Sequence, residues 1–271
     1  MADSGGLLQN RYGLNLDGPD VPPAVAALLD RRVTRRYRDT DVPDALLDTL
    51  LAAAQSAPTK SDLQQYSVVV MRDRARIKQI ADWIGSMDWI ATAPVLLVWC
   101  GDMRRGQRLC EMHGMPHANN NLDTFLNTAV DCALAMGQFM AAADAVDIGT
   151  CPISYVRSHI ERVSPLLGLP SGVYPVAGLT VGWPEFRRPV SMRLPPAVVV
   201  HRERYDDTRL ESDIAAYDKR RGPVAAGSLK NSDLYPPRDG VGWSENVARQ
   251  LSVPERFGFA AYLKTRGFDL A

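Results

Sequence analysis

The sequence is poor in cysteine and has no excess of either charge. Only four cysteines occur among 271 residues, and their spacings match neither a CxxC motif nor a zinc-binding pattern. We therefore expect reduced thiols, as is usual in a cytoplasmic protein. The 31 basic residues balance 31 acidic ones, so we expect no overall field that would attract nucleic acid or a membrane surface.

The chain also lacks an uninterrupted apolar run long enough to cross a membrane. The most apolar long stretch, residues 122–146, contains Asp123, Asp131 and Asp144. A membrane-spanning helix rarely carries three acidic residues. The N-terminal segment "MADSGGLLQN" has no basic start followed by an apolar core, so we expect no signal peptide and a cytoplasmic location.

Motifs of several enzyme classes are absent from the sequence. It contains neither a Walker A motif nor GxGxxG, which excludes a P-loop or Rossmann cofactor site. No serine lies in a GxSxG motif, which argues against a serine hydrolase. His113 and His117 are separated by Gly114 and Pro116. These two residues break the helix that would align the imidazoles, so we expect no metal site.

Strand and helix patterns alternate along the chain. Runs rich in β-branched and apolar residues predict strands at 66–71, 93–100 and 174–184, and residues 150–154 indicate a short strand or a turn. Helical spacing of apolar residues predicts helices at 21–32, 40–58, 72–85, 120–146, 205–222 and, with an interruption, 243–268. The class is therefore α/β or α+β with a mixed sheet. The helix at 120–146 is apolar on nearly every face, which is typical of a core or a subunit interface.

The stretch "RRVTRRYRDTDVP" (31–43) is locally basic, with arginine at five of its first eight positions. One interpretation is a solvated surface in which the arginines pair with Asp30, Asp39, Asp41 and Asp44. Arg36 and Arg38 are expected to pair with Asp39 and Asp41 even if other arginines of the run bind a ligand. The other is a phosphate site, because a guanidinium group binds phosphate oxygens in a bidentate manner.

A second polar stretch, "AQSAPTKSDLQQYSVVV" (54–70), lies between a helix and a strand. The helix ends at Pro58, and a turn rich in hydroxyl, amide and carboxylate groups follows. Turns of this composition place hydroxyls, an amide and backbone N–H groups around a polar ligand.

Together, the two stretches resemble the opening of the nitroreductase-like family of FMN-dependent oxidoreductases. In that family an Arg-Ser-x-Arg-x-Phe-like run precedes a helix and an Ala-Pro-Ser-x-x-Asn-x-Gln-Pro-Trp-like turn. Residues 90–102, 131–153, 164–195 ("SPLLGLPSGVYPVAGLTVGWPEFRRPVSMRLP") and 243–268 are similar to later segments of one subgroup. This subgroup contains the oxygen-insensitive NADPH nitroreductases and the FRP-type flavin reductases.

The resemblance implies an architecture for the whole chain. It implies an α+β, three-layer α/β/α fold with a mixed, mainly antiparallel sheet and a long central helix at a homodimer interface. Residues 1–271 would form a single domain with an N-terminal arm at 1–21. Variable lid regions are expected at 103–120 and 223–242.

The resemblance also implies that FMN is bound non-covalently at the dimer interface, in a site built from both chains, and that the arginine run binds it. Arg31 and Arg35 would hold the FMN phosphate, and Arg32 would reach the pyrimidine edge of the flavin. Val33 stands where the family usually has serine, so one hydroxyl contact would be missing.

Further FMN contacts are implied by the segments after the run. Arg193 matches a second phosphate-binding arginine, and Ser191 stands where the subgroup often has lysine. The turn would contact the ribityl chain and the ring through Thr59, Ser61, Asp62 and Gln64. Asp62 replaces the asparagine that is usual in the family.

Two other segments match positions around the ring. Pro152, Ile153 and Ser154 match the segment that covers one flavin face. Because proline has no N–H, a contact to flavin N5 would come from Ile153 or Ser154. Met87 stands where many relatives have a polar ring contact.

The activity implied is ping-pong reduction of nitroaromatics, quinones or flavins. NADPH or NADH would donate a hydride to the bound flavin, and a small-molecule oxidant would then take the electrons. Arg32 would stabilise the reduced flavin, and Lys230 or Arg238 would meet the NADPH 2′-phosphate. Two alternatives stay open. One is a specialised FMN-dependent biosynthetic dehydrogenase, oxidase or reductive dehalogenase on the same scaffold, and the other is a flavin-binding protein without turnover.

Overall fold

The structure is a computed structural model that describes residues 2–271, and the chain forms two compact units. Unit 1 comprises residues 2–31 and 189–255, and unit 2 comprises residues 32–188 and 256–271. The single domain expected for residues 1–271 stays a prediction.

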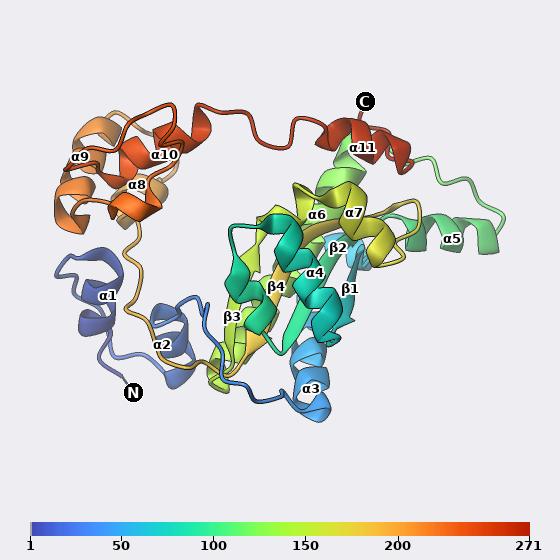
Figure 1. Ribbon diagram of the computed structural model, residues 1–271, viewed down its shortest axis with the longest axis horizontal. Coiled ribbons are helices and arrows are strands. Elements are labelled where there is room, and N and C mark those ends of the chain that lie inside the picture. Colours follow the sequence, from blue (N-terminus) through green and yellow to red (C-terminus); the bar gives the residue numbers. More distant parts are fainter. Residues whose placement is uncertain (1) are drawn as a thin grey trace. The chain divides into compact units, whose positions relative to one another are not determined.

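Unit 2 is built around a four-stranded sheet with the strand order β1-β2-β4-β3 (Figure 1). The strands are β1 (Tyr66–Met71), β2 (Val95–Asp102), β3 (Gly149–Ile153) and β4 (Val173–Gly182). Every pairing between these strands is antiparallel, so the sheet formed by the described residues is not mixed. β2 and β4 are the central strands and are buried along almost their whole length. Burial on both faces explains why their sequences are continuous apolar runs.

Helices cover both faces of this sheet and complete three layers (Figure 1). α3 (Asp44–Gln55) and α6 (Leu122–Ala145) pack on one face, and α4 (Arg74–Ile84) and α7 (Ile160–Leu166) pack on the other. The fold class predicted from the sequence is therefore confirmed as α+β.

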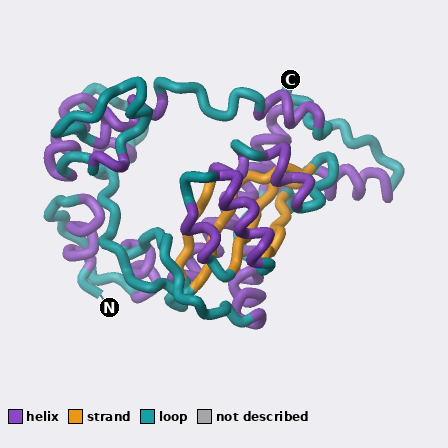
Figure 2. The backbone as a smooth tube through the Cα atoms, viewed as in Figure 1, coloured by secondary structure: helices purple, strands orange, loops and turns teal. Residues whose placement is uncertain are grey.

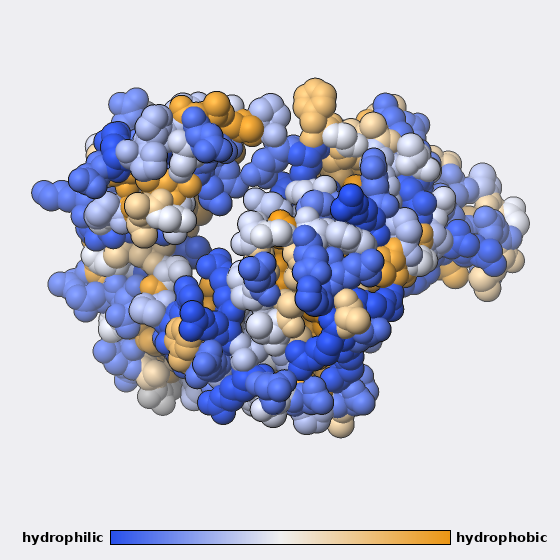
Figure 3. Space-filling model, in the orientation of Figure 1, coloured by the Kyte–Doolittle hydropathy of each residue, from blue (hydrophilic) through white to orange (hydrophobic). Residues whose placement is uncertain are grey.

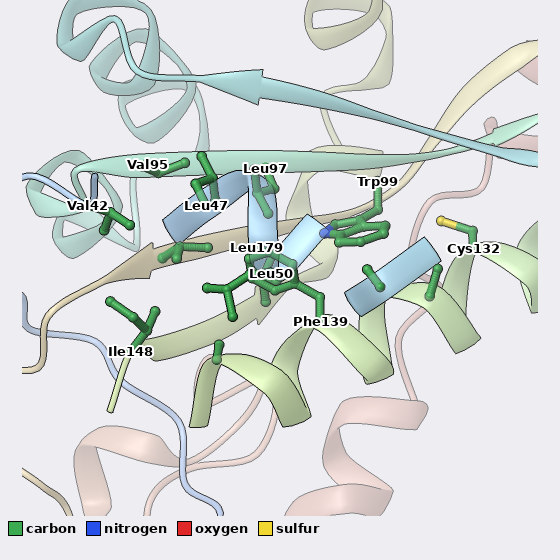
Figure 4. Packing of buried hydrophobic residues seen from close by; sticks show 14 residues of the cluster. Val42, Leu47, Leu50, Val95, Leu97, Trp99, Cys132, Phe139, Ile148 and Leu179 are labelled. Atoms are coloured by element: carbon green, nitrogen blue, oxygen red, sulfur yellow. The ribbon is translucent and has the colours of Figure 1, made fainter. Parts of the chain in front are cut away.

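The core between the sheet and α6 contains the largest buried side chain. Trp99 of β2 is fully buried and meets Phe139 of α6 edge to face, with 5.8 Å between ring centroids. Leu50 of α3 and Leu179 of β4 belong to the same cluster (Figure 4). Edge-to-face packing is a favoured geometry of aromatic pairs. This core fixes α3 and α6 relative to the sheet.

α4 shows how the local sequence defines a helix on the opposite face. Asp73 caps the N-terminus, and its carboxylate accepts a hydrogen bond from Ala75 N at 2.9 Å. Ile77 and Ile80 are buried at helical spacing on the face that packs against the sheet. Gly85 ends the helix with φ of 67°, a conformation that glycine adopts without steric cost.

α6 is a 24-residue helix with two different faces. Asn121 caps its N-terminus by accepting from Thr124 N at 3.0 Å. The face toward the sheet is buried, whereas four apolar residues spaced four apart form a stripe on the other side. The stripe consists of Leu122, Leu126, Val130 and Leu134, which are 53%, 55%, 45% and 44% exposed.

α5 (Arg104–Met112) and the irregular chain at 113–121 extend from the sheet of unit 2 (Figure 2). They occupy most of the region 103–120 that was predicted to be a lid. α11 (Phe259–Thr265) returns to this unit and packs on a small aromatic cluster. Short 3₁₀ turns complete the unit: η1 (Lys60–Asp62), η2 (Asp88–Thr92) and η3 (Ser154–Arg157). On the side of α4 and α7 the surface is mainly hydrophilic (Figure 3).

Unit 1 is helical. Its elements are α1 (Ser4–Tyr12), α2 (Pro23–Leu29), α8 (Pro196–Val199), α9 (Leu210–Arg221), η4 (Ala226–Ser228) and α10 (Trp243–Leu251). Tyr217 of α9 is buried and meets Trp243 of α10 edge to face at 5.3 Å. The Asp218 carboxylate accepts from Ser244 N at 3.1 Å, which fixes the start of α10. In the part of the chain that the structure describes, no helix is long and apolar enough to cross a membrane.

Candidate functional site

Backbone hydrogen bonds hold the arginine-rich segment of unit 2 against one end of the sheet. Thr34 N donates to Thr150 O at 2.9 Å, next to the start of β3. Arg38 N donates to Trp183 O at 2.9 Å, just after the end of β4. Residues 32–38 are therefore extended along the sheet and not helical, which fits the β-branched residues of this segment.

The buried side chain of Tyr37 attaches this segment to the sheet. Its side chain is buried, and its hydroxyl donates to Thr34 O at 2.7 Å and lies 2.7 Å from Thr180 Oγ1. Burial raises the pKa of Tyr37 because the phenolate would be desolvated. Arg32 and Val33, which precede the anchor, are half-buried.

Two arginines of the segment are exposed and lie over aromatic rings. The Arg35 guanidinium is 5.8 Å from the centroid of Trp89, and that of Arg36 is 5.8 Å from the centroid of Phe186. Stacking of this kind fixes a guanidinium plane while its edge stays open to hydrogen-bond acceptors. The role of Arg35 in phosphate binding stays a prediction.

The ion pairs predicted within the run are wrong. Asp39 and Asp41 face Arg74 of α4, at 3.6 Å and 3.9 Å, instead of Arg36 and Arg38. The extended backbone points neighbouring side chains in different directions, and the fold brings α4 to the aspartates. These are exposed pairs that contribute little to stability.

In unit 1, the buried side chain of Arg11 ties together three backbone segments. Its guanidinium donates to Leu29 O and Arg31 O, both at 2.7 Å, and to Ser191 O at 3.0 Å. Arg193 N donates to Arg11 O at 2.8 Å. Arg11 therefore gathers the segments that carry three of the residues predicted to bind FMN.

We define Arg11, Arg31 and Arg193 as one cationic cluster, because the charges of Arg193 and Arg31 both act on Arg11. Burial lowers the pKa of Arg11, and the positive charges of Arg193 and Arg31 lower it further. The negative charge of Asp30 acts on Arg11 in the opposite sense. Guanidinium groups bind phosphate oxygens through charge-assisted hydrogen bonds, so the cluster is a candidate anion site. Arg11 was missed in the sequence analysis because nothing in the arm at 1–21 marks it.

The polar turn of unit 2 has an unusual backbone. Ser61, Asp62 and Gln64 have φ of 49°, 57° and 52°, in the left-handed region that costs a non-glycine residue roughly 1–2 kcal/mol. Within the turn, Gln64 N donates to Thr59 Oγ1 at 3.3 Å, and Gln64 Nε2 donates to Asp62 Oδ1 at 3.1 Å. All three left-handed residues are exposed. The turn thus displays a hydroxyl, a carboxylate and an amide to solvent.

Two residues from other elements hold this turn, and neither was singled out as a site residue from the sequence. Asp131 of α6 accepts from Lys60 N at 2.9 Å and from Gln65 N at 3.0 Å. Arg105 of α5 donates to Gln64 O. α5, which lies in the predicted lid region 103–120, is therefore bonded directly to the turn.

Residues predicted to cover the flavin lie at the end of β3. Pro152 and Ser154 are exposed and Ile153 is buried. Arg256 Nη2 donates to Ser154 Oγ at 3.0 Å, a contact between distant parts of the sequence that no motif indicated. Met87 is half-buried and packs against the apolar cluster under α4, so its side chain offers no polar contact.

Two basic residues of unit 1 were proposed as contacts for the NADPH 2′-phosphate. Arg238 forms an ion pair with Glu245. Lys230 N donates to Asn246 Oδ1 at 2.8 Å, and within residues 2–271 its ammonium group forms no ion pair. Of the two side chains, only that of Arg238 is occupied by an ion pair within residues 2–271, so Lys230 is the stronger candidate for the contact with the NADPH 2′-phosphate.

The predicted FMN residues are distributed over both units. Unit 1 carries Arg31, Ser191 and Arg193, which the Arg11 contacts link. Unit 2 carries the rest: Arg32, Val33, Arg35, Thr59, Ser61, Asp62, Gln64, Met87, Pro152, Ile153 and Ser154. Across residues 2–271, no group of three His, Cys, Asp or Glu side chains is placed to hold a metal ion.

Sequence comparison identifies two adjoining matches that cover most of the chain. The pattern of the Nitroreductase family matches residues 28–87 and 82–183. That of the Nitroreductase family, C-terminal domain, matches residues 191–271.

Individual relatives agree with these matches. The chain is 37% identical over 227 residues to FMN reductase [NAD(P)H] from Bacillus subtilis, covering 83% of this chain and 89% of that protein. It is 30% identical over 251 residues to the oxygen-insensitive NADPH nitroreductase of Salmonella typhimurium, covering 92% and 99%. The solved structure of B. megaterium NfrA2 superposes with a TM-score of 0.83 at 30% identity, covering 93% of this chain and all of the other. The chain therefore belongs to the nitroreductase family.

Proposed function

We propose that this protein is an FMN-dependent NAD(P)H oxidoreductase that reduces nitroaromatic compounds, quinones or free flavins. The observation that carries the proposal is the Arg11, Arg31 and Arg193 cluster, in a chain whose relatives include FMN reductases. A cluster of arginines suits a flavin phosphate, because a guanidinium group binds phosphate oxygens in a bidentate manner.

The residues of the chain fit FMN in their chemistry. Arg31, Arg193 and Arg35 would bind the phosphate through charge-assisted hydrogen bonds. Thr59, Ser61 and Gln64 would offer hydroxyl and amide groups to the ribityl chain and the ring. The turn that carries them is exposed and already shaped by its left-handed residues.

Bound FMN would supply the redox chemistry, taking a hydride from NAD(P)H and passing the electrons to an oxidant in ping-pong order. The chain's own residues bind and orient the reactants. Arg32 would place a positive charge near the pyrimidine edge and favour negative charge there. An N–H of Ile153 or Ser154 would face N5. Lys230 would select NADPH by meeting its 2′-phosphate.

The active form is proposed to be a homodimer, as the family resemblance implies. The apolar stripe of α6 is the surface on this chain that supports it, because four large apolar side chains in a row lie open to solvent. The partners would then be a second copy of this chain, a nicotinamide cofactor and a small-molecule oxidant. The cytoplasmic location predicted from the cysteine usage of the sequence is part of this proposal.

The first experiment is an absorbance spectrum of the purified protein, recorded again after anaerobic addition of NADPH and then of an oxidant. The proposal expects a yellow protein whose flavin band bleaches with NADPH and returns with a quinone or a nitroaromatic compound. A flavin that stays oxidised with both NADPH and NADH would favour a specialised enzyme or a non-turnover flavin protein. A colourless protein that cannot be reconstituted with FMN would contradict the proposal.

A further inference from the structure

Both oxygens of a buried carboxylate in α6 accept hydrogen bonds from the turn at 59–65. The side chain of Asp131 is 0% exposed, in a helix that is otherwise largely apolar. Its Oδ1 accepts from Lys60 N at 2.9 Å, and its Oδ2 accepts from Gln65 N at 3.0 Å. Burying a carboxylate is costly unless it is hydrogen-bonded. Both oxygens are directed at one short segment, one at each end.

The segment between these two bonds cannot hold its shape by itself. It contains the left-handed residues Ser61, Asp62 and Gln64, each of which is strained and exposed. Strained backbone of this kind persists only where contacts with the surrounding structure hold it in place. Bonds within the turn are local, whereas Asp131 fixes both ends of the turn to the rigid α6.

We propose that Asp131 is a positioning residue for FMN binding. It holds the turn in the conformation that aims Thr59, Ser61 and Gln64 at the cofactor, and it does so without touching the cofactor itself. This role rests on the proposed function. Asp131 also connects the proposed FMN site to α6, the helix whose opposite face carries the exposed stripe.

The first test compares two buried polar residues of α6. Asp131→Asn keeps the shape but leaves a single acceptor, so one backbone N–H faces an NH₂ group. Thr128→Val is the matched control. Thr128 is also 0% exposed, and its hydroxyl donates to Phe125 O at 2.7 Å, lies 3.1 Å from Tyr174 OH and does not contact the turn. Both variants lose a buried hydrogen bond, but only the first loosens residues 59–65.

Two readouts separate positioning from general damage. FMN titration is expected to give a dissociation constant at least about tenfold higher for Asp131→Asn, the cost of one unsatisfied buried donor. Thr128→Val is expected to stay within about twofold of the wild type. In the apoprotein, hydrogen exchange should accelerate in residues 59–66 of Asp131→Asn and not in those residues of Thr128→Val.

A second pair of variants probes the same bond from the turn and covers the case in which Asp131→Asn does not fold. Lys60→Pro removes the N–H that Asp131 accepts. Lys60 is exposed and opens η1, and Thr59 before it is extended at φ −130° and ψ 159°, so proline is tolerated there. Lys60→Ala keeps the N–H. The first is expected to weaken FMN binding several-fold, and the second is expected to leave it unchanged.

The outcomes distinguish this role from the proposed function. A wild-type protein that binds no FMN overturns the proposed function and this role with it. If the wild type binds FMN and Asp131→Asn and Lys60→Pro bind it equally well, the positioning role alone is overturned. If Thr128→Val weakens FMN binding as much as Asp131→Asn does, both effects reflect a general loss of stability, and the positioning role is likewise overturned.

Discussion

At the residue scale, Arg35 and Arg36 form a natural pair for an experiment. Both are exposed, adjacent in sequence and 5.8 Å above an aromatic ring. Of these two residues, the family resemblance assigns a phosphate contact to Arg35 and none to Arg36. A charge-assisted hydrogen bond is worth about 1.5–3 kcal/mol. We therefore expect Arg35→Ala to raise the FMN dissociation constant roughly tenfold to a hundredfold, as measured by fluorescence titration.

Arg36→Ala is the matched control for this prediction. It removes an equal charge and a stacking contact of the same kind, on Phe186 instead of Trp89, so a general loss of positive potential would affect both variants equally. The control is expected to bind FMN within about twofold of the wild type. Equal affinities for the two variants would assign the phosphate contact to other arginines.

Residue types alone identified only part of the candidate site. The arginine run and the polar turn stand out because guanidinium and hydroxyl groups are concentrated there. The sequence alone could have indicated Asp131, since an acidic residue inside an apolar helix needs hydrogen-bond donors when it is buried. Arg11 carried none. Its importance comes from carbonyl groups at 29, 31 and 191 that only the folded chain brings together.

At the element scale, strands were predicted more reliably than short helices. β1 coincides with the predicted run at 66–71, because its β-branched residues suit a strand. α5 and α7 were not predicted. α5 has few apolar residues, and α7 is only seven residues long and contains Pro165, so neither offers the long run of apolar residues at helical spacing on which a helix prediction rests. Ion pairs such as that of Arg74 with Asp39 depend on how elements pack, which local patterns do not contain.

Contact between β3 and the arginine segment gives a prediction at this scale. A Cβ atom added to Gly149 would lie 2.3 Å from Thr34 Oγ1 and 2.6 Å from Thr34 Cβ. Gly149→Ala should therefore push the segment at 32–35 away from the sheet, at a cost of about 1–3 kcal/mol. We expect a melting temperature lower by roughly 2–10 °C in differential scanning fluorimetry, with weaker FMN binding.

Gly227→Ala is the control for this prediction, because a Cβ atom there would meet nothing within 4 Å. Its melting temperature and FMN affinity are expected to match those of the wild type. If Gly149→Ala behaves like this control, Thr34 is free to move and the close packing of the segment does not matter for binding.

At the scale of the whole molecule, the buried core determines how stability responds to alkali. Burial raises the pKa of Cys100 to about 12 and raises the pKa values of Cys132, Tyr37 and Tyr174. A raised pKa in the folded state gives stability that is complete below the unfolded pKa and is lost as the pH rises above it. We expect the free energy of unfolding to fall between about pH 9 and pH 12, by up to about 1.4 kcal/mol per pH unit for each group.

Urea denaturation at a series of pH values from 7.5 upward measures this loss. The thiols titrate first in the unfolded chain, because their ordinary pKa is about 8.5 and that of tyrosine is about 10. A variant with both Cys100→Ala and Cys132→Ala should therefore show a smaller slope between pH 9 and pH 10. A slope identical to that of the wild type would mean that these thiols do not contribute.

The stripe of α6 gives the last prediction, which concerns assembly. A carboxylate at Val130, in the middle of four exposed apolar residues, would have to be desolvated if two copies of α6 met there. Light scattering during gel filtration should give twice the 29.8 kDa chain mass for the wild type and the single mass for Val130→Glu. Leu251→Glu, at a residue of α10 that is 78% exposed, is the control and should stay dimeric. Because the resemblance implies sites built from both chains, monomeric Val130→Glu should also lose FMN. A dimer that persists in Val130→Glu would place the subunit interface elsewhere.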